Sequence, residues 1–127
     1  MDSKSIINTP NAPAPIGPYS QAVKLNNTLY VSGQIAIDPS TGNLIDGDIA
    51  QETRQVMENI LAILESAGLT FDQVVKCSIF VSDLNNFESI NRIYGEYFGS
   101  MAPARETVEV SRLPKNVNVE ISCIAGG

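Results

Sequence analysis

The sequence predicts an α+β domain in which two helices cover one face of a β-sheet. The length of 127 residues suits one domain with one core over the whole chain, 1–127. Apolar residues make up 43%, which is typical of a folded protein rather than a disordered one. The spacing of apolar residues along the chain predicts the order strand, strand, helix, strand, helix, strand, strand. This order leaves both helices available to one face of the sheet.

The first elements are an irregular lead-in and a hairpin. Residues 1–18 are rich in proline, which lacks a backbone N–H donor, so an irregular segment is expected there. A strand over 22–25 and a return strand over 29–37 are expected to join at the Asn-Asn turn 26–27, because asparagine tolerates the positive φ of hairpin turns. The DPSTGN stretch, 38–43, has the composition of a second turn.

The first helix is expected to follow directly. Asp48 is the predicted N-cap, with Gln51 in the capping-box position. Gly68 marks its end. Its core-facing stripe consists of Ile49, Val56, Ile60, Ile63, Leu64 and Ala67.

A third strand and a second helix are predicted next. Alternate residues of the strand over 73–81 are expected to face the core, namely Val75, Cys77, Ile79 and Val81. The helix begins near Asn86 and ends at Gly99, with Phe87, Ile90, Tyr94, Tyr97 and Phe98 at helical spacing. The cysteines, Cys77 and Cys123, are expected to be buried free thiols.

The last two strands, 104–110 and 117–125, are expected to pair with each other across the SRLPKN loop. Alternation then places Arg105, Thr107, Glu109, Asn118, Glu120 and Ser122 on the uncovered face of the sheet. A symmetric loop sets Thr107 opposite Glu120 and Arg105 opposite Ser122.

Aromatic and apolar side chains are also expected on this uncovered face, among polar ones. They are Tyr30, Phe80 and Ile124, and the polar neighbours include Ser32, Gln34, Lys76 and Ser78. A mixed face of this kind is typical of a subunit interface, which would also enclose a site between subunits. We therefore expect an oligomer.

Arg105 and Glu120 are the candidate chemical pair in this arrangement. The planar guanidinium of arginine matches a carboxylate, and a glutamate can position and deprotonate a water molecule. The alternative is that the two form a cross-strand ion pair with no chemical role. Tyr19, Ser32 and Asn91 have ordinary structural interpretations in isolation, as turn packing and local hydrogen bonding.

Composition excludes several classes of protein. The chain has no histidine, which excludes Ser-His-Asp and Cys-His nucleophile systems and histidine-bearing zinc sites. The net charge of −6 argues against nucleic-acid binding. No apolar run is long enough to span a membrane, so a soluble protein of the cytoplasm or an organelle matrix is expected. Neither a cofactor nor a metal is expected.

Three stretches carry a resemblance to a known family: IGPYSQAV, LYVSGQIAIDPSTGN and PARETVEVSRLPKNVNVEISCIA. They resemble the Rid or YjgF family, the reactive intermediate imine/enamine deaminases, from about Asn11 to Ala125. The resemblance implies a chorismate-mutase-like subunit with a mixed sheet and both helices on one face. It also implies a homotrimer with sites in the clefts between neighbouring subunits.

The resemblance further implies a reaction and a set of residues. The reaction is hydrolysis of 2-imino acids, such as 2-iminobutanoate and 2-iminopropanoate, to 2-oxo acids and ammonia. Arg105 matches the arginine that binds the substrate carboxylate, and Glu120 matches the acid that orients or activates water. The matching pocket positions are Tyr19, Ser32, Gly33, Asn91 and the backbone of Thr107.

The chain departs from many members of that family near these positions. Thr107 stands in place of a cysteine, Glu106 in place of a small residue, and the GSMAPAR stretch is shorter. Two other functions are open: a trimeric regulator that binds 2-oxo acids without catalysis, and the ribonuclease or translation-inhibitor role proposed for some relatives. The absence of histidine and the net charge of −6 disfavour ribonuclease chemistry.

Overall fold

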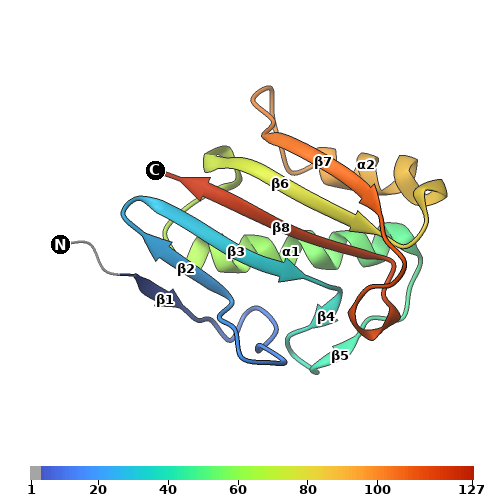
Figure 1. The fold of residues 1–127 in the computed structure, drawn as a ribbon, viewed down its shortest axis with the longest axis horizontal. Helices are drawn as coiled ribbons and strands as arrows, with labels where there is room; N and C mark the ends of the chain where they lie inside the picture. The colour runs from blue at the N-terminus through green and yellow to red at the C-terminus, as the bar shows by residue number, and fades with distance from the viewer. Residues whose placement is uncertain (1–3) are drawn as a thin grey trace.

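The computed structural model describes residues 4–127 and confirms the mixed α+β architecture, with both helices on one face of a sheet (Figure 1). The strands are β1 (Ser5–Ile7), β2 (Ala22–Leu25), β3 (Thr28–Gln34), β4 (Ile37–Asp38), β5 (Asn43–Leu44), β6 (Val74–Val81), β7 (Ala104–Glu109) and β8 (Val119–Gly126). The helices are α1 (Ile49–Ser66) and α2 (Phe87–Gly95), with short 3-10 turns at Phe71–Gln73, Leu84–Asn86 and Pro114–Asn116. Six strands form one sheet in the order β1-β2-β3-β8-β6-β7, and β4 pairs with β5 separately.

The N-terminal half follows the predicted hairpins with two differences. Asn26 has φ 56° in the turn between β2 and β3, as its residue type predicted. Residues 5–7, expected to be irregular, form β1 beside β2, while the first three residues of the predicted lead-in lie outside the described range. β3 ends at Gln34 rather than Ile37. Its pairing with β8 shifts between Val31 and Gln34, so Gln34 pairs with Ile121 and is buried instead of lying on the uncovered face.

Helix α1 begins and ends where the sequence predicts. The Asp48 side chain accepts from the Gln51 backbone N–H at 2.9 Å, and the Gln51 side chain accepts from the Asp48 backbone N–H at 2.9 Å. Gly68 follows the helix with φ 76°. The buried side of the helix packs on the sheet through Val56, Met57, Ile60, Ile63 and Leu64.

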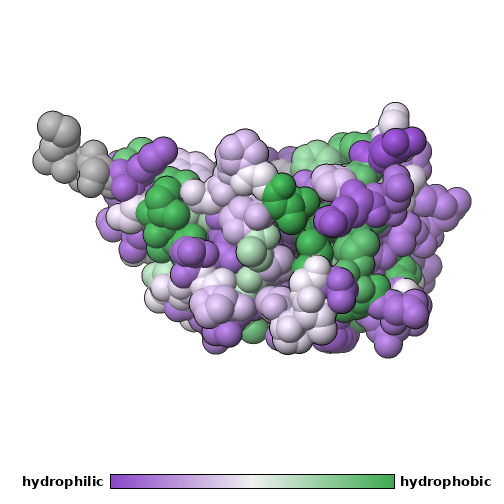
Figure 2. Space-filling view, turned by 90° about the horizontal axis from the view of Figure 1, so that it is seen from below, coloured by the Kyte–Doolittle hydropathy of each residue, from purple (hydrophilic) through white to green (hydrophobic). Residues whose placement is uncertain are grey.

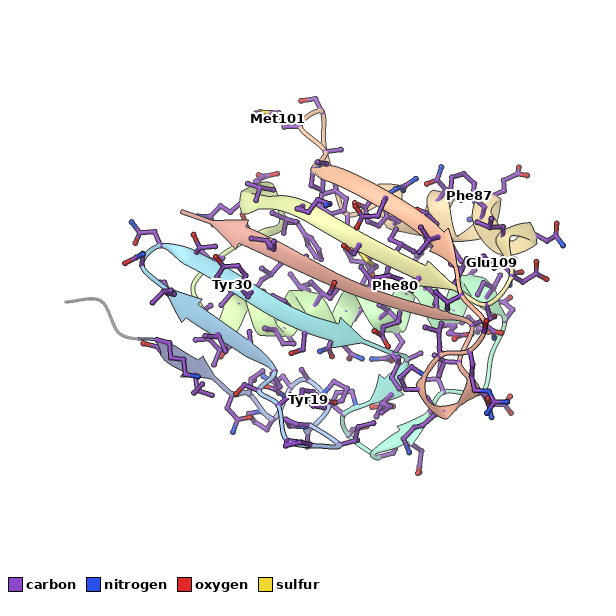
Figure 3. All side chains as sticks on the ribbon, viewed as in Figure 1. Tyr19, Tyr30, Phe80, Phe87, Met101 and Glu109 are labelled. Atoms are coloured by element: carbon purple, nitrogen blue, oxygen red, sulfur yellow. The ribbon has the colours of Figure 1, made fainter. Side chains whose placement is uncertain are left out.

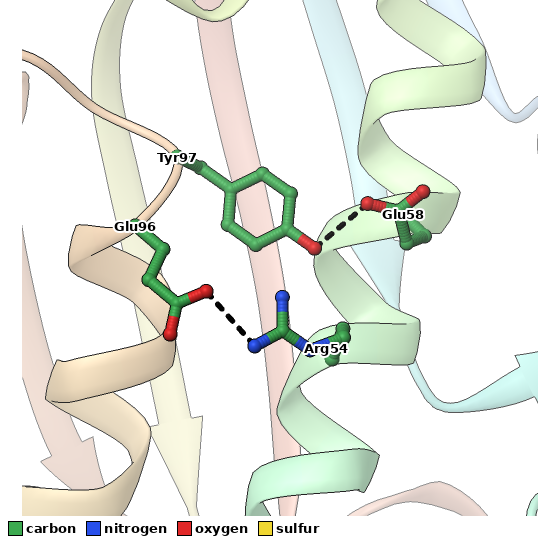
Figure 4. A network of polar contacts seen from close by, with 4 residues as sticks. All are labelled: Arg54, Glu58, Glu96 and Tyr97. Atoms are coloured by element: carbon green, nitrogen blue, oxygen red, sulfur yellow. Dashed lines mark hydrogen bonds and ion pairs between the residues drawn. The ribbon is translucent and has the colours of Figure 1, made fainter.

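Helix α2 is shorter than predicted, because it ends at Gly95 rather than Gly99. Tyr97 and Phe98 lie beyond its end, and their rings pack against Phe71 at centroid distances of 5.3 and 5.2 Å. Polar contacts then join the helices: Arg54 pairs with Glu96 at 2.9 Å, and the Tyr97 hydroxyl donates to Glu58 at 2.7 Å (Figure 4).

The predicted pairing of the last two strands is wrong. β7 pairs in parallel with β6, and β6 lies between β7 and β8. Helix α2 is the crossover that parallel neighbours need, whereas the SRLPKN loop carries the chain past the end of β6 to β8. Thr107 therefore pairs with Ile79, and Glu120 pairs with Phe80.

This pairing reverses the predicted orientation of β7. Arg105 pairs with Cys77, which faces the helices, so Arg105 and Thr107 lie on the helix-covered face. Glu106 lies on the uncovered face, where it forms an ion pair with Lys76 at 2.9 Å. The predicted orientation of β8 is confirmed, with Val119, Ile121, Cys123 and Ala125 buried under the helices.

A smaller correction concerns β6. The pairing of β6 with β8 shifts between Val74 and Lys76, and Val75 is consequently 57% exposed rather than part of the core. Cys77 and Cys123 are buried free thiols, as expected, and burial raises the pKa of both.

The uncovered face of the sheet carries aromatic side chains, as predicted. Tyr30 is 48% exposed, and both Tyr30 and Phe80 lie on the side of the sheet opposite the helices (Figure 3). Within residues 4–127, no helix is long and apolar enough to cross a membrane.

Candidate functional site

A cavity of about 320 Å³ lies between the N-terminal strap, which we define as residues 8–21, and the end of β3. Apolar side chains of the strap form one wall, and Pro114 from the loop before β8 contributes another. Figure 2 shows the molecule from the strap side, where hydrophobic and hydrophilic surface alternate. The polar groups that line the cavity include Tyr19, Ser32 and Glu120.

Gly33 and Glu120 fit against each other inside this cavity. A Cβ atom added to Gly33 would lie 2.8 Å from Cδ of Glu120 and closer still to its carboxylate oxygen. Such a contact is too short for any side chain, so glycine is the residue that leaves room for the carboxylate. The family resemblance implied both residues, and the structure brings them together.

Glu120 is half-buried in the cavity. Burial raises the pKa of the Glu120 carboxyl above its ordinary value of 4.5, and it is the one cause acting on this group. A carboxylate with a raised pKa is a better proton acceptor than an exposed one. The position therefore suits a group that takes a proton from water.

Hydrogen bonds fix the neighbouring side chains of the cavity. The backbone N–H of Ile16 donates to the Tyr19 hydroxyl at 3.2 Å, which holds the ring inside the strap. The Ser32 hydroxyl donates to the carbonyl of Ser20 at 2.6 Å, which ties β3 to the strap. Tyr19 and Ser32 thus line the same cavity as Glu120.

Gln21 anchors the strap and was not singled out from the sequence. Its buried side-chain amide donates to the carbonyls of Thr9, Ala12 and Pro13 at 2.9–3.2 Å. Its side-chain carbonyl accepts from the Thr9 backbone N–H at 2.7 Å. The available signal was a glutamine within the IGPYSQAV stretch, directly before an apolar strand.

Arg105 lies in a second group of residues beneath α2. Its guanidinium donates to the side-chain oxygen of Asn91 at 2.6 Å. The guanidinium carbon also lies 4.9 Å from the ring centroid of Tyr94 and 5.6 Å from that of Phe87. These contacts position the guanidinium and leave further N–H donors for a ligand carboxylate.

Two buried hydroxyl groups lie on the helix-covered side of the sheet, as Arg105 does. The Thr107 hydroxyl has no hydrogen-bond partner among the described residues, and the Tyr94 hydroxyl lies beside the thiol of Cys77. Burial is the largest cause that raises the pKa of Tyr94 far above its ordinary value, so its hydroxyl stays protonated. The sequence indicated Tyr94 only as a core residue.

The predicted convergence of Arg105 and Glu120 within one chain is wrong. Arg105 lies on the helix-covered face of β7, Glu120 lies on the opposite face of β8, and β6 separates the two strands. The alternative of a cross-strand ion pair between them is wrong for the same reason. The candidate residues of one chain therefore form two separate groups. We name them the cavity half-site, with Tyr19, Ser32, Gly33 and Glu120, and the arginine half-site, with Asn91, Arg105 and Thr107.

Within the described part of the chain, no group of three or more acidic, cysteine or histidine side chains could hold a metal ion. The half-sites accordingly offer one guanidinium, one carboxylate and several hydroxyl groups. These groups suit recognition of a small carboxylate and general acid–base chemistry on it.

Comparisons with known proteins identify relatives of nearly the whole chain. The family model described as endoribonuclease L-PSP matches residues 9–126. A RutC family protein of Pyrococcus horikoshii is 56% identical over 96% of this chain and 97% of its own length. The 2-iminobutanoate/2-iminopropanoate deaminase of Bos taurus is 47% identical over 96% of this chain and 89% of its own length. The crystal structure of E. coli TdcF with bound serine is 40% identical, with a TM-score of 0.93 over 97% of this chain and 98% of TdcF.

Proposed function

Because the chain belongs to the Rid/YjgF family, we propose that it hydrolyses reactive 2-imino acids and enamines, such as 2-iminobutanoate and 2-iminopropanoate, to 2-oxo acids and ammonia. The bovine deaminase of that name, at 47% identity, supports this substrate class. The observation that carries the proposal is the pair of half-sites, because together they supply a carboxylate-binding guanidinium and a half-buried proton acceptor.

The proposed active site is shared between subunits of a homotrimer. Because Arg105 and Glu120 lie on opposite faces of the sheet, one ligand can contact both only if they come from different chains. The exposed aromatic and apolar side chains of the uncovered face support burial against a second copy. Tyr30 and Phe80 belong to this face (Figure 3).

Arg105 is proposed to bind the substrate carboxylate. Asn91 and the rings of Phe87 and Tyr94 hold its guanidinium in place, so little side-chain freedom is lost when a ligand binds. Serine bound to TdcF carries an α-carboxylate of the kind that this arginine would recognise. The buried Thr107 hydroxyl and backbone lie on the same face of β7 as Arg105 and offer further hydrogen bonds.

Glu120 is proposed to handle the water molecule. Water attacks C2 of the protonated imine as its proton passes to Glu120, which gives a tetrahedral carbinolamine. The proton then moves from Glu120 to the amino nitrogen, the C–N bond breaks, ammonia leaves, and the hydroxyl proton is released as the 2-oxo group forms. A protonated imine is already electrophilic, so this reaction needs no side-chain nucleophile, metal or cofactor.

The description of the matching family model mentions an endoribonuclease, and this chain is poorly suited to cleaving RNA. It has no histidine to act as a neutral-pH acid or base, and its net charge is −6. Phosphodiester substrates need cationic partners, whereas a 2-imino acid needs one guanidinium for its single carboxylate. We therefore favour the imine as substrate.

The proposal is tested with threonine dehydratase, which releases 2-iminobutanoate from threonine, in the presence of semicarbazide to trap surviving imine. The wild-type protein is expected to lower the amount of trapped imine, and Arg105→Ala is expected to remove this effect. If trapping is unchanged but 2-oxobutanoate binds, the protein is a carboxylate-binding regulator rather than an enzyme.

A further inference from the structure

Glu52 is a buried acid that the proposed mechanism does not use. It lies in the first turn of α1 with 8% of its surface exposed. Its carboxylate accepts two hydrogen bonds from a single residue, one from the backbone N–H of Asn118 at 2.8 Å and one from the Asn118 side-chain amide at 2.8 Å. We infer that Glu52 is a positioning residue that fixes the orientation of Glu120 through Asn118.

This inference rests on the proposed function, since Glu120 acts there on the attacking water. Asn118 lies two residues before Glu120, just ahead of the first residue of β8. A bond from α1 to this point sets where the strand starts and which way its first side chains point. Figure 1 shows the start of α1 and the loop before β8 at the same end of the sheet.

Two features of its position strengthen the contact between Glu52 and Asn118. The positive end of the α1 dipole stabilises an anion in the first helical turn. Hydrogen bonds to a carboxylate are shorter and stronger than bonds between neutral groups, and Asn118 supplies two of them. The contact is therefore a rigid link between the helix layer and the strand that carries Glu120.

Ser82 binds the two acceptor groups of Asn118. The Ser82 backbone N–H donates to the Asn118 carbonyl at 3.1 Å, and the Ser82 hydroxyl lies 3.2 Å from the Asn118 side-chain oxygen. Both donor groups of Asn118 thus bind Glu52, and both acceptor groups bind Ser82 at the end of β6. One asparagine joins α1, β6 and β8.

The loop that Asn118 ends is strained. Lys115 and Asn116 have φ values of 55° and 56°, so two successive non-glycine residues adopt the left-handed conformation. Such residues persist only where the surrounding structure holds them. Pro114, which lines the cavity, directly precedes them, so release of Asn118 would move a cavity wall as well as Glu120.

Loss of the Glu52–Asn118 contact is expected to slow the chemical step rather than to weaken substrate binding. Placement of a base and its water within a fraction of an ångström governs the rate, whereas the Arg105 that would bind the substrate carboxylate in the shared site belongs to the neighbouring chain. Loss of the Glu52–Asn118 contact is therefore expected to lower kcat and to leave KM almost unchanged.

The experiment uses Glu52→Gln in the full-length protein. The new amide at position 52 keeps an acceptor for the backbone N–H of Asn118 but directs its NH₂ group at the Asn118 NH₂ group, so the second bond is lost. We expect kcat for 2-iminobutanoate to fall about tenfold, with KM within about twofold of wild type. The matched control is Glu58→Gln, the same chemical change on the same helix, where the carboxylate accepts from Tyr97 outside the site (Figure 4).

A swapped pair separates positioning from a general loss of structure. In Glu52→Gln combined with Asn118→Asp, the new amide donates to the new carboxylate, whose second oxygen still accepts from Ser82. This double variant is expected to recover kcat to within about threefold of wild type. Asn118→Ala, which keeps the backbone bond to Glu52, serves as a second single variant should Glu52→Gln fail to fold, and we expect it to lower kcat with KM unchanged.

Each outcome bears on the inference. Wild-type kcat in Glu52→Gln or in Asn118→Ala, or a double variant no faster than Glu52→Gln, overturns it while the proposed function stands. A wild-type protein without imine turnover removes the proposed function and this inference with it. Reduced kcat, unchanged KM and recovery in the swapped pair support both.

Discussion

Gly33 lies so close to Glu120 that a Cβ atom at position 33 would approach Cδ of Glu120 to 2.8 Å. The absence of a side chain at position 33 therefore leaves room for a side chain on the neighbouring strand. The backbone does not call for glycine, since the φ of Gly33 is not among the positive values of the chain. A substitution at this position tests the placement of the carboxylate without removing it.

We predict that Gly33→Ala lowers kcat for 2-iminobutanoate about tenfold or more, because the added methyl group must displace the Glu120 carboxylate from its position beside the bound water. Steady-state kinetics and circular dichroism together measure the loss of rate and the retention of fold. Gly99→Ala is the control, since a Cβ atom there meets nothing within 4 Å. Equal kcat values in the two variants would mean that the position of Glu120 is not critical.

The pH dependence of the rate follows from the burial of Glu120. Burial raises the pKa of Glu120 above 4.5, and the proposed mechanism needs the ionised carboxylate. As the pH is lowered, kcat is therefore predicted to begin to fall while the pH is still above 4.5. Glu120→Gln should abolish this acidic limb together with most of the activity. An acidic limb that persists in the residual activity of Glu120→Gln would assign it to another group.

The same group makes a prediction about stability. A carboxyl whose pKa is higher in the folded than in the unfolded state binds its proton more tightly when folded, so it disfavours folding at pH values above both pKa values. Glu120→Gln is therefore expected to raise Tm at pH 7, and the difference from wild type should shrink as the pH falls through the raised pKa. Thermal unfolding at pH 7 and pH 4 measures both values; a lower Tm at pH 7 would contradict the prediction.

The strap offers a separate test of how the cavity is built. Gln21→Ala leaves the Thr9 N–H and three strap carbonyls without the partners that Gln21 provides. Because unsatisfied buried polar groups are costly, we expect the free energy of unfolding to fall by about 2–4 kcal/mol in urea denaturation. Gln55→Ala, which loses one hydrogen bond to Asn59, is the control and should lose much less stability. A similar loss in both variants would show that Gln21 has no special role in the strap.

Local signals account for most of the predicted elements. The capping box of Asp48 and Gln51 and the turn at Asn26 depend on residues within a few positions of each other, and both are confirmed. The end of α2 was misjudged because the aromatic residues Tyr97 and Phe98 continue the helical spacing although they pack from a turn. Spacing alone does not distinguish a helix from residues that follow it.

The sequence did not predict correctly which strands lie beside each other at the end of the chain. The SRLPKN loop is short enough for a hairpin, so local chemistry favoured antiparallel pairing of the last two strands. The strand–helix–strand order of β6, α2 and β7 was the competing signal, because it is typical of parallel neighbours. The hairpin pairing placed Arg105 on the wrong face of the sheet. The predicted contact between Arg105 and Glu120 was therefore wrong as well.

Three buried polar residues were missed for a related reason. Glu52, Asn59 and Gln21 bind backbone groups that lie far from them in the sequence. A polar residue on an otherwise apolar stripe gives no indication of its partner, and Asn59, which donates to the carbonyls of Ile35 and Ile37, is an example. Among the cavity residues, Glu120 was indicated by residue type and strand alternation, whereas Tyr19, Ser32 and Gly33 were indicated as site residues only by the family resemblance.

A shared active site makes the most specific prediction of the structure. Arg105→Ala and Glu120→Gln are each expected to retain little activity alone, because each removes a key group from one half-site of every chain. When the two variants are unfolded together and refolded, some interfaces combine an intact Arg105 from one chain with an intact Glu120 from its neighbour. Random assembly gives about one quarter of such interfaces, so about a quarter of the wild-type activity should return.

The control for this experiment is the double variant Arg105→Ala with Glu120→Gln, refolded together with wild type. Intact sites then arise only where both neighbours are wild type, which is again about a quarter of the interfaces at equal mixing. If Arg105 and Glu120 of the same chain formed the site, this second mixture would instead keep about half of the activity, and the first would recover none. Since β6 separates the two residues within a chain, we expect the values of the shared site.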